Sequence, residues 1–305
     1  MTKKIVLLAG PTASGKSKLA IEIAKKIKGE IINADSMQVY KDFSILSSRP
    51  SNTELKKVKH NLYGFVSSNK HFSTGAWLTL VKKQIKLCLK RKKTPILVGG
   101  TGLYFEAITK GMSKIPNINF KFRNKVRTLQ NKLGQKEFYK KLLKTDPLVK
   151  NKIEPFDTQR SIRAYEVKKF TKKSLFQWHK LTKSDFKDFE ILKIFLDTPR
   201  DVILKNIYKR TKNMFKNNCI TEVKNFKKLD IDPTFSINKI IGVKEIKEHL
   251  ENKLDLNQTI ELINIKTRQY AKKQVTWSRG HMIDWKREYS NSFSELSKKI
   301  LKLLS

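Results

Sequence analysis

Residues able to bind phosphate gather near the start of the chain. The short apolar run Ile5–Ala9 leads directly into Gly10-Pro-Thr-Ala-Ser-Gly-Lys-Ser17. Glycines in such a loop let backbone N–H groups converge on phosphate oxygens, the lysine neutralises the distal phosphate, and the serine hydroxyl is a ligand for Mg²⁺. Apolar residues at helical spacing follow from Leu19 to Ile27. This order of strand, loop and helix predicts a phosphate-binding loop (P-loop), and the alternative is a chance glycine-rich turn.

Two further strand ends carry polar side chains. A β-like run ends in Asp35-Ser-Met-Gln-Val-Tyr40, and a buried-looking apolar run ends in Gly99-Gly-Thr-Gly102. Ligands of parallel sheets gather at the carboxyl ends of the strands, so we expect Asp35 and Thr101 to lie beside the P-loop. Asp35 could act as a base, hold Mg²⁺ through water or cap a turn. The side-chain amide of Gln38 could bond both N6–H and N7 of an adenine.

Alternating elements position these loops. Strand-like runs at 5–9, 30–34, 96–98 and 191–196 are separated by helical patterns that include 19–27 and 75–92. Such alternation predicts an α/β fold with a parallel sheet. The texture changes at about residue 113, after which the pattern is helical without clear strands. We therefore predict three segments: the first part of the core at 1–113, a helical insertion domain at 114–190, and a mostly helical remainder of the core at 191–305.

The charge balance points to a polyanionic partner. The 305 residues include 66 Lys and Arg against 27 Asp and Glu, a net charge of +39. The region 114–196 alone has 22 basic and 8 acidic side chains. Nucleic acid is the usual partner of such a surface. The alternative is a general lysine bias, because 55 of the 66 basic residues are lysine. Against that background, an arginine marks a position where a bidentate fork is required.

Several classes of protein are not supported. The two cysteines, Cys88 and Cys219, and the five histidines have no metal-ligand spacing, so neither a zinc site nor a disulfide framework is expected. We find no signal peptide pattern and no apolar run approaching the ~18 residues that span a bilayer. These observations predict a cytoplasmic protein without a membrane partner.

Five separated motifs occur together in one order along the chain. They are Gly10-Pro-Thr-Ala-Ser-Gly-Lys-Ser17, Asp35-Ser-Met-Gln-Val-Tyr40, Gly99-Gly-Thr-Gly-Leu-Tyr-Phe105, Asp157-Thr-Gln-Arg-Ser-Ile-Arg163 and Gln274-Val-Thr-Trp277. This set resembles the tRNA dimethylallyltransferases, also called tRNA isopentenyltransferases or the IPP transferase family. The resemblance implies a P-loop NTPase-like parallel sheet core and a helical insertion that grips the anticodon stem of tRNA.

The resemblance also implies an activity. Members of the family transfer a dimethylallyl group from dimethylallyl diphosphate to N6 of the adenine 3′-adjacent to the anticodon, and release pyrophosphate. The implied substrates are tRNAs that read codons beginning with U. The implied cofactor is Mg²⁺, and a monomer is expected.

Residue roles follow from the matching motifs. Asp35 would orient N6 and accept its proton, and Thr101 would stand beside the reacting groups. The diphosphate would be held by the P-loop and one distant arginine, that is by Gly10, Pro11, Thr12, Ala13, Ser14, Gly15, Lys16, Ser17 and Arg210, with Mg²⁺ on Ser17. Contacts with tRNA are implied for Asp35, Ser36, Met37, Gln38, Thr101, Arg123, Gln159, Arg160, Ser161, Ile162 and Arg163.

The sequence departs from the family's usual motifs at two places, and its P-loop is also compatible with other functions. Ser47 stands where the family commonly has threonine, and Asn218-Cys219 stands where a glycine is usual, which suggests a helix cap. A related transferase acting on free adenine nucleotide, or a small-molecule kinase, would share the P-loop but would need no basic insertion. A third possibility is an RNA-binding ATPase that uses the P-loop as a switch.

Overall fold

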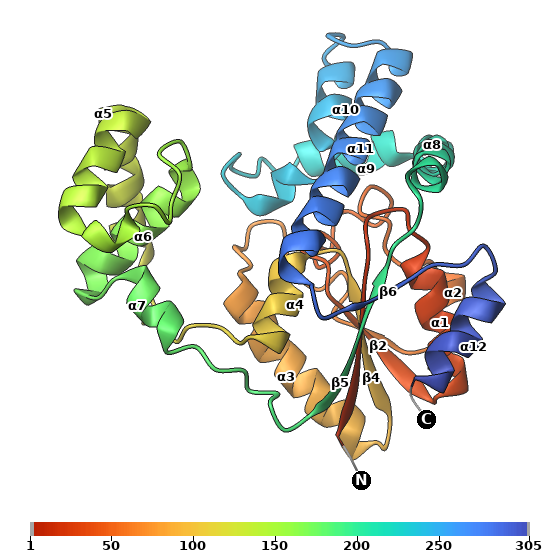
Figure 1. Ribbon diagram of the computed structural model, residues 1–305. Helices are drawn as coiled ribbons and strands as arrows, with labels where there is room; N and C mark the ends of the chain where they lie inside the picture. Colours follow the sequence, from red (N-terminus) through yellow and green to blue (C-terminus); the bar gives the residue numbers. More distant parts are fainter. Residues whose placement is uncertain (1–2, 304–305) are drawn as a thin grey trace. The chain divides into compact units, whose positions relative to one another are not determined.

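The computed structural model describes residues 3–303, which form two compact units (Figure 1). The core unit contains the residues up to Ala107 and those from Lys187 onward, and the inserted unit is Ile108–Phe186. The structure therefore divides the chain at 108 and 186, where the sequence suggested 114 and 190. No helix within 3–303 is long and apolar enough to cross a membrane.

A parallel sheet organises the core unit. Within the described residues it has six strands in the order β3-β2-β4-β1-β5-β6, and every neighbouring pair is parallel. The strands are β1 (Lys4–Ala9), β2 (Gly29–Asn33), β3 (His60–Asn61), β4 (Thr94–Gly99), β5 (Glu190–Leu196) and β6 (Lys286–Glu288). The α/β class and the four longer strands are confirmed. The two short edge strands, β3 and β6, were not predicted, because neither coincides with an apolar run in the sequence.

Helices cover both faces of the sheet (Figure 1). On one face, Leu19 and Ile23 of α1 and Leu296 of α12 pack with Val6 and Leu8 of β1 in one buried cluster. Figure 1 shows α3 on the opposite side. The helices of the core unit are α1 (Lys16–Lys26), α2 (Asn52–Lys57), α3 (Thr74–Lys90), α4 (Gly102–Thr109, which leads into the inserted unit), α8 (Arg200–Lys216), α9 (Cys219–Lys227), α10 (Val243–Leu250), α11 (Leu256–His281) and α12 (Phe293–Lys302).

A second apolar cluster supports the segment that follows β2. Phe43 and Leu46 of this segment pack with Phe226 of α9, Ile246 of α10 and Ile263 of α11. The segment thus has a core of its own beside the sheet.

The inserted unit is helical, and its helices pack around Phe138, Leu142 and Val167. It contains α5 (Phe120–Thr145), a 3-10 turn (Pro147–Val149), α6 (Thr158–Thr171) and α7 (Leu175–Lys180). Gly134 interrupts α5 with a φ of 69°, a left-handed conformation that glycine adopts without strain. The unit has 21 basic and 6 acidic side chains.

Close backbone approach at the end of β4 requires a glycine. A Cβ built on Gly99 would lie 2.0 Å from the carbonyl oxygen of Ala34. The backbones of the two strand ends can be neighbours only without a side chain at this position. This contact sets the spacing between the loop that follows β2 and the loop that follows β4.

Replacing Gly99 by alanine is expected to lower the free energy of unfolding by about 2–3 kcal/mol, the range of core overpacking. Gly280→Ala in α11 is the matched control, because a Cβ there meets nothing within 4 Å. That change should leave stability unchanged or raise it by up to about 1 kcal/mol. Urea unfolding of both variants checks the pair, and equal midpoints would contradict the interpretation.

Candidate active site

The P-loop joins β1 to α1 in a strained, well-fixed conformation. Ala13 and Gly15 have φ values of 64° and 87°. A Cβ on Gly15 would lie 2.6 Å from the ring of Phe293, so the loop is packed from beneath by α12. The ammonium of Lys16 donates to the carbonyl oxygen of Pro11 at 3.0 Å. Lys16 therefore folds back over the loop, where it can meet a bound phosphate.

Side chains from distant parts of the chain hold the loop in place. Thr198 after β5 donates to the Ser14 carbonyl at 3.1 Å, and Asn206 of α8 donates to the Ala13 carbonyl at 3.0 Å. The amide N–H of Thr12 donates to the side chain of Gln274 at 2.8 Å. The Thr12 N–H is therefore used within the protein, and so is the Ser14 N–H, which donates to the Pro11 carbonyl at 3.3 Å. The amides at the start of α1 are left for an anion.

Two cationic side chains face this loop. Arg210 of α8 donates through Nη1 to the Thr12 hydroxyl at 2.7 Å. Its buried Nε and the buried hydroxyl of Ser14 have no hydrogen-bond partner in the described part of the chain. Burial lowers the pKa of Lys16 to about 8, although the charge of Asp35 acts in the opposite direction. Buried donors without acceptors are costly, so the site is arranged for an anion that supplies the acceptors.

Asp35 lies at the end of β2 and is fixed by its own neighbours. The buried side chain of Asn33 accepts from the Asp35 N–H at 2.9 Å and donates to the Asp35 carbonyl at 3.0 Å. The Asp35 carboxylate accepts from the N–H of Met37 at 2.9 Å. Trp77 of α3 donates to the carbonyl of Asn33 at 2.8 Å. Sequence reasoning missed Asn33, which looks in the sequence like an ordinary strand residue.

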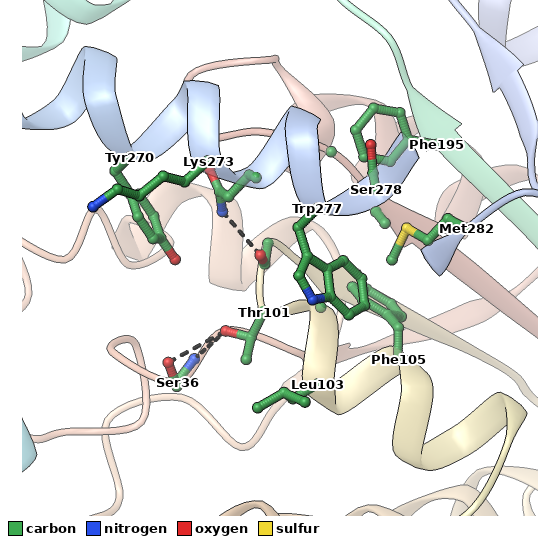
Figure 2. A pocket seen from close by; sticks show the side chains of 15 residues that line it. Ser36, Thr101, Leu103, Phe105, Phe195, Tyr270, Lys273, Trp277, Ser278 and Met282 are labelled. Atoms are coloured by element: carbon green, nitrogen blue, oxygen red, sulfur yellow. Dashed lines mark hydrogen bonds between the residues drawn. The ribbon is translucent and has the colours of Figure 1, made fainter. Parts of the chain in front are cut away.

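The loops after β2 and β4 are bonded to each other through Thr101 (Figure 2). Its hydroxyl accepts from the Ser36 N–H at 2.9 Å and donates to the Ser36 hydroxyl at 3.3 Å. One lone pair of the Thr101 oxygen remains for a substrate donor. Gln274 completes the frame, because its NH₂ group donates to the Gly100 carbonyl at 2.9 Å. The predicted meeting of Asp35, Thr101 and the P-loop is therefore observed.

The negative charge of Asp35 affects the pKa values of three nearby tyrosine hydroxyls. Burial raises the pKa values of Tyr63, Tyr104 and Tyr270, and the nearby Asp35 carboxylate adds to each shift. All three are therefore neutral hydroxyls at physiological pH. Burial lowers the pKa of Arg210, and the charge of Asp35 opposes this shift. The Asp35 carboxylate is thus close enough to two cations and three neutral tyrosine hydroxyls to affect the pKa of each.

Two cavities meet at Ser36 and Tyr270, which line both. The Trp277 cavity, of about 290 Å³, is walled mainly by apolar and aromatic side chains. Figure 2 shows Trp277 reaching from α11 toward Thr101, Leu103 and Phe105. The Arg210 cavity, of about 270 Å³, adjoins the P-loop and is lined by Thr12, Asp35, Ser36, Met37, Leu46, Ser47, Ser48, Arg210, Met214, Lys239, Ile240, Ile241, Ile263, Thr267 and Tyr270.

Gln38 is more restricted than its sequence suggested. Both hydrogens of its NH₂ group are used, since Nε2 donates to the carbonyls of Ser47 and Ser48 at 2.9 Å each. A bidentate contact with adenine would break these bonds, so only its Oε1 is available to a base. The Ser47 hydroxyl also stays within the loop, where it donates to the Phe43 carbonyl.

Glu222 of α9 holds the same loop from the other side. Its carboxylate accepts from the N–H groups of Ile45 at 2.9 Å and Leu46 at 3.0 Å, and from the N–H of Ser44. Three converging amides form an anion-binding nest, here filled by the protein's own carboxylate. The helix that carries Glu222 begins after Asn218, which occupies the N-cap position with a left-handed φ of 62° and makes no capping hydrogen bond through its side chain. No short motif in the sequence signalled Glu222.

In the inserted unit, the residues predicted to contact tRNA differ in exposure. Gln159 and Arg160 are exposed in the first turn of α6, and Ile162 is half-buried. Ser161 is fully buried, and its hydroxyl accepts from Gln135 at 3.2 Å. The side chain of Ser161 therefore packs inside the unit, and its implied contact with tRNA stays a prediction.

Arg163 and Arg123 belong to a buried charge cluster in the same unit. Arg163 Nη1 lies 3.5 Å from the carboxylate of Glu166, which is 4% exposed. Arg163 Nη1 and Arg123 Nε have no hydrogen-bond partner among the described residues. Burial raises the pKa of Glu166, whereas the charges of Arg123, Arg163 and Arg127 lower it. Although the Nη1 atom of Arg163 is buried, its side chain is 37% exposed, so part of the guanidinium is accessible to an anion such as phosphate.

The protein side chains near the P-loop can bind Mg²⁺ only together with oxygen ligands from a bound diphosphate and water. Among residues 3–303 there is no group of three or more His, Cys, Asp and Glu side chains that could hold a metal ion. A Mg²⁺ bound to a diphosphate needs only one or two protein oxygens, because phosphate and water supply the rest. The exposed hydroxyl of Ser17, in the first turn of α1, fits that requirement.

Anion binding at the P-loop should depend on the charge of Lys16. Its pKa of about 8 means that the ammonium is charged below pH 8 and neutral above it. Affinity for inorganic pyrophosphate should therefore fall about tenfold between pH 7 and pH 9, since one unit above a pKa about one group in ten is charged. Calorimetric titration at fixed ionic strength measures this. Lys16→Arg should remove this component, and equal pH slopes in the two proteins would refute it.

Removing the Glu222 carboxylate should release the loop at Ser44–Leu46. In Glu222→Ala, the amides of Ser44, Ile45 and Leu46 should exchange hydrogen about tenfold faster or more, because each loses a charge-assisted bond. Glu222→Gln should show a smaller change. Glu251→Ala, which removes a carboxylate that pairs with Lys227 and Lys253, is the control and should leave those amides protected.

The chain is similar to known proteins in sequence and in fold. The sequence profile of the family described as IPP transferase matches residues 38–281. The tRNA dimethylallyltransferase of Pelagibacter ubique is 56% identical over 282 residues, covering 92% of this chain and 90% of that protein. The solved tRNA isopentenylpyrophosphate transferase of Bacillus halodurans is 29% identical with a TM-score of 0.70, covering 99% of this chain and 97% of its own. A eukaryotic dimethylallyltransferase, described as acting on tRNA, is 28% identical with a TM-score of 0.77, covering 91% and 70%. The chain belongs to the IPP transferase family.

Proposed function

We propose that the chain transfers a dimethylallyl group from dimethylallyl diphosphate to N6 of the adenine 3′-adjacent to the anticodon of tRNA. Its relatives are named tRNA dimethylallyltransferase, and one solved neighbour acts on tRNA. The observation that carries the proposal is the junction of the two cavities. The Arg210 cavity, whose lining includes the cations Arg210 and Lys239, shares Ser36 and Tyr270 with the aromatic Trp277 cavity, so two substrates can meet there.

The Arg210 cavity suits the diphosphate ester. Thr12, Asp35 and Arg210 are among its polar lining residues, and the side chains of Leu46, Met214, Ile240, Ile241 and Ile263 form its apolar part. Lys16 lies close enough to Asp35 and Arg210 for their charges to act on its pKa. A diphosphate at the polar end would supply acceptors for Arg210 Nε and the amides at the start of α1. A Mg²⁺ bound by Ser17 and the diphosphate would neutralise part of the leaving group's charge.

The Trp277 cavity suits the adenine. Its aromatic walls can stack on a purine, and an anticodon-loop base can be extruded into it at a cost of a few kcal/mol. Ser36 and Thr101 lie at the end that adjoins the Arg210 cavity. The free lone pair on Thr101 can accept from an exocyclic amine, which turns the N6 group toward the allylic carbon.

We assign the role of proton acceptor to Asp35. The N6–carbon bond forms as the carbon–oxygen bond to the diphosphate breaks, and the electron pair of that bond leaves with pyrophosphate. N6 then carries an extra proton, which passes to the Asp35 carboxylate. Lys16 and Arg210 oppose the charge that gathers on the departing pyrophosphate. Asn33 fixes the backbone of Asp35 during this transfer.

The inserted unit supplies the surface for tRNA. Its excess of basic side chains favours a polyanion, and Gln159, Arg160 and the Arg123–Arg163 cluster are its proposed contacts with the anticodon stem-loop. The chain acts as a monomer in this proposal, because every group assigned to the diphosphate comes from one chain. A tRNA substrate also favours action in the cytoplasm.

Three assays separate the proposal from its competitors. Labelled dimethylallyl diphosphate should label tRNA and leave AMP unlabelled, because AMP cannot use the inserted unit. Digested tRNA should contain isopentenyl adenosine only after incubation with the protein. An RNA-dependent ATPase would instead hydrolyse ATP and leave the RNA unprenylated, which would overturn the proposal. Prenylation of AMP at the rate of tRNA would point to a free-nucleotide transferase.

Asp35→Asn should lower single-turnover prenylation by on the order of a hundredfold or more, the usual contribution of a general base. Affinity for tRNA should stay within about tenfold of the parent protein. Asp197→Asn is the control, because Asp197 also follows a strand but pairs with Arg287 and lines neither cavity. Equal turnover in Asp35→Asn and the parent would remove Asp35 from the catalytic role.

A further inference from the structure

The inserted unit holds one aromatic ring almost entirely in solvent. Phe156 is 89% exposed, more than any other large hydrophobic side chain in residues 3–303. We propose that Phe156 is a stacking platform for an unpaired base of the RNA substrate. The inference rests on the proposed function, because it assigns a recognition residue to the same tRNA.

The turn that carries Phe156 is anchored. From α5, the side chain of Gln135 donates to the Pro155 carbonyl at 2.7 Å, and the Tyr139 hydroxyl donates to the Ile153 carbonyl at 2.8 Å. The Thr158 N–H donates to the carbonyl of Phe156 itself at 3.0 Å. The ring is therefore displayed by a fixed backbone, and little conformational entropy is lost when a partner covers it.

Phe156 stands next to the exposed RNA-binding turn. Asp157 caps α6 by accepting from the Arg160 N–H at 3.0 Å, and it also pairs with the Arg160 side chain at 3.0 Å. The exposed Gln159 and Arg160 therefore follow the ring within one helical turn. RNA bound to this turn would bring its bases within reach of the ring.

The charges of the turn favour a base over a phosphate. Between Ile153 and Asp157 the turn has no lysine or arginine, and the carboxylate of Glu154 is exposed. Phosphate would be repelled there, whereas the uncharged face of an unstacked base can cover the phenyl ring. Aromatic stacking of single-stranded bases tolerates any base because every base has a π-face. Phe156 should add affinity without reading sequence.

The test compares Phe156→Ala, Phe156→Trp and a matched control, Leu148→Ala. Leu148 is also apolar, exposed at 44% and part of the same unit. Binding of an anticodon stem-loop RNA is measured by anisotropy over a range of salt concentrations. Phe156→Ala should weaken binding about tenfold, within the range of one stacked base, with an unchanged salt slope because no charge is lost.

The other variants make the result specific. Phe156→Trp should retain affinity, and its tryptophan fluorescence should be quenched by RNA beyond the change in the parent protein. Leu148→Ala should bind like the parent. Prenylation at saturating tRNA should be equal in all of these proteins, because Phe156 does not touch the reacting atoms.

Contrary outcomes are distinguishable. If Phe156→Ala binds RNA like the parent while the parent prenylates tRNA, this inference fails and the proposed function stands. If Phe156→Ala changes the sedimentation coefficient and leaves RNA affinity intact, the ring is a protein contact and the inference also fails. If the parent binds RNA but does not prenylate it, and Phe156→Ala still weakens binding, the proposed function fails while the stacking role survives.

Discussion

The site depends on one amide side chain that joins two loops. Gln274 accepts from the Thr12 N–H of the P-loop and donates to the Gly100 carbonyl after β4. A side-chain amide is suited to this task because it presents one acceptor and two donors in a plane. Since Gln274 lies on a long helix, α11, the spacing of the loops is set by a rigid element. The positions of Thr101 and Ser36 follow from that spacing.

Around Gln274, the loops of the site are already held by hydrogen bonds within the protein, whereas a flexible site would become ordered only when substrate binds. The loop amides, the Asp35 backbone and the loop at Ser44–Leu46 are each held by a side chain from elsewhere. Among the buried side-chain groups of the described residues that stay unpaired, the Ser14 hydroxyl and Arg210 Nε lie at the P-loop. These two donors are already in place for a bound anion, which is the arrangement that lowers reorganisation during a reaction.

Much of the fold and part of the site could be predicted from the sequence. The P-loop and the apolar strands are local patterns, so the sheet and the meeting of Asp35 with Thr101 followed from the rule for parallel strands. Gln274 and Glu222 act through partners far away in the chain; Gln274 begins one of the matching motifs, but nothing local shows which groups either side chain joins. Asn33 acts on Asp35, two residues away, but looks in the sequence like an ordinary strand residue. β6 is a charged, three-residue edge strand that forms because β5 is beside it. The burial of Ser161 likewise depends on α5 packing, which spacing within α6 does not reveal.

The contact between Gly15 and Phe293 links the first loop of the chain to its last described helix. Lys18 also lies over that ring, with its ammonium 4.8 Å from the ring centre. During synthesis the glycine-rich segment leaves the ribosome long before the phenyl ring that supports it. A nascent chain that ends before residue 293 has a P-loop without this packing contact, so the conformation of the first loop is completed only when almost the whole chain has been made.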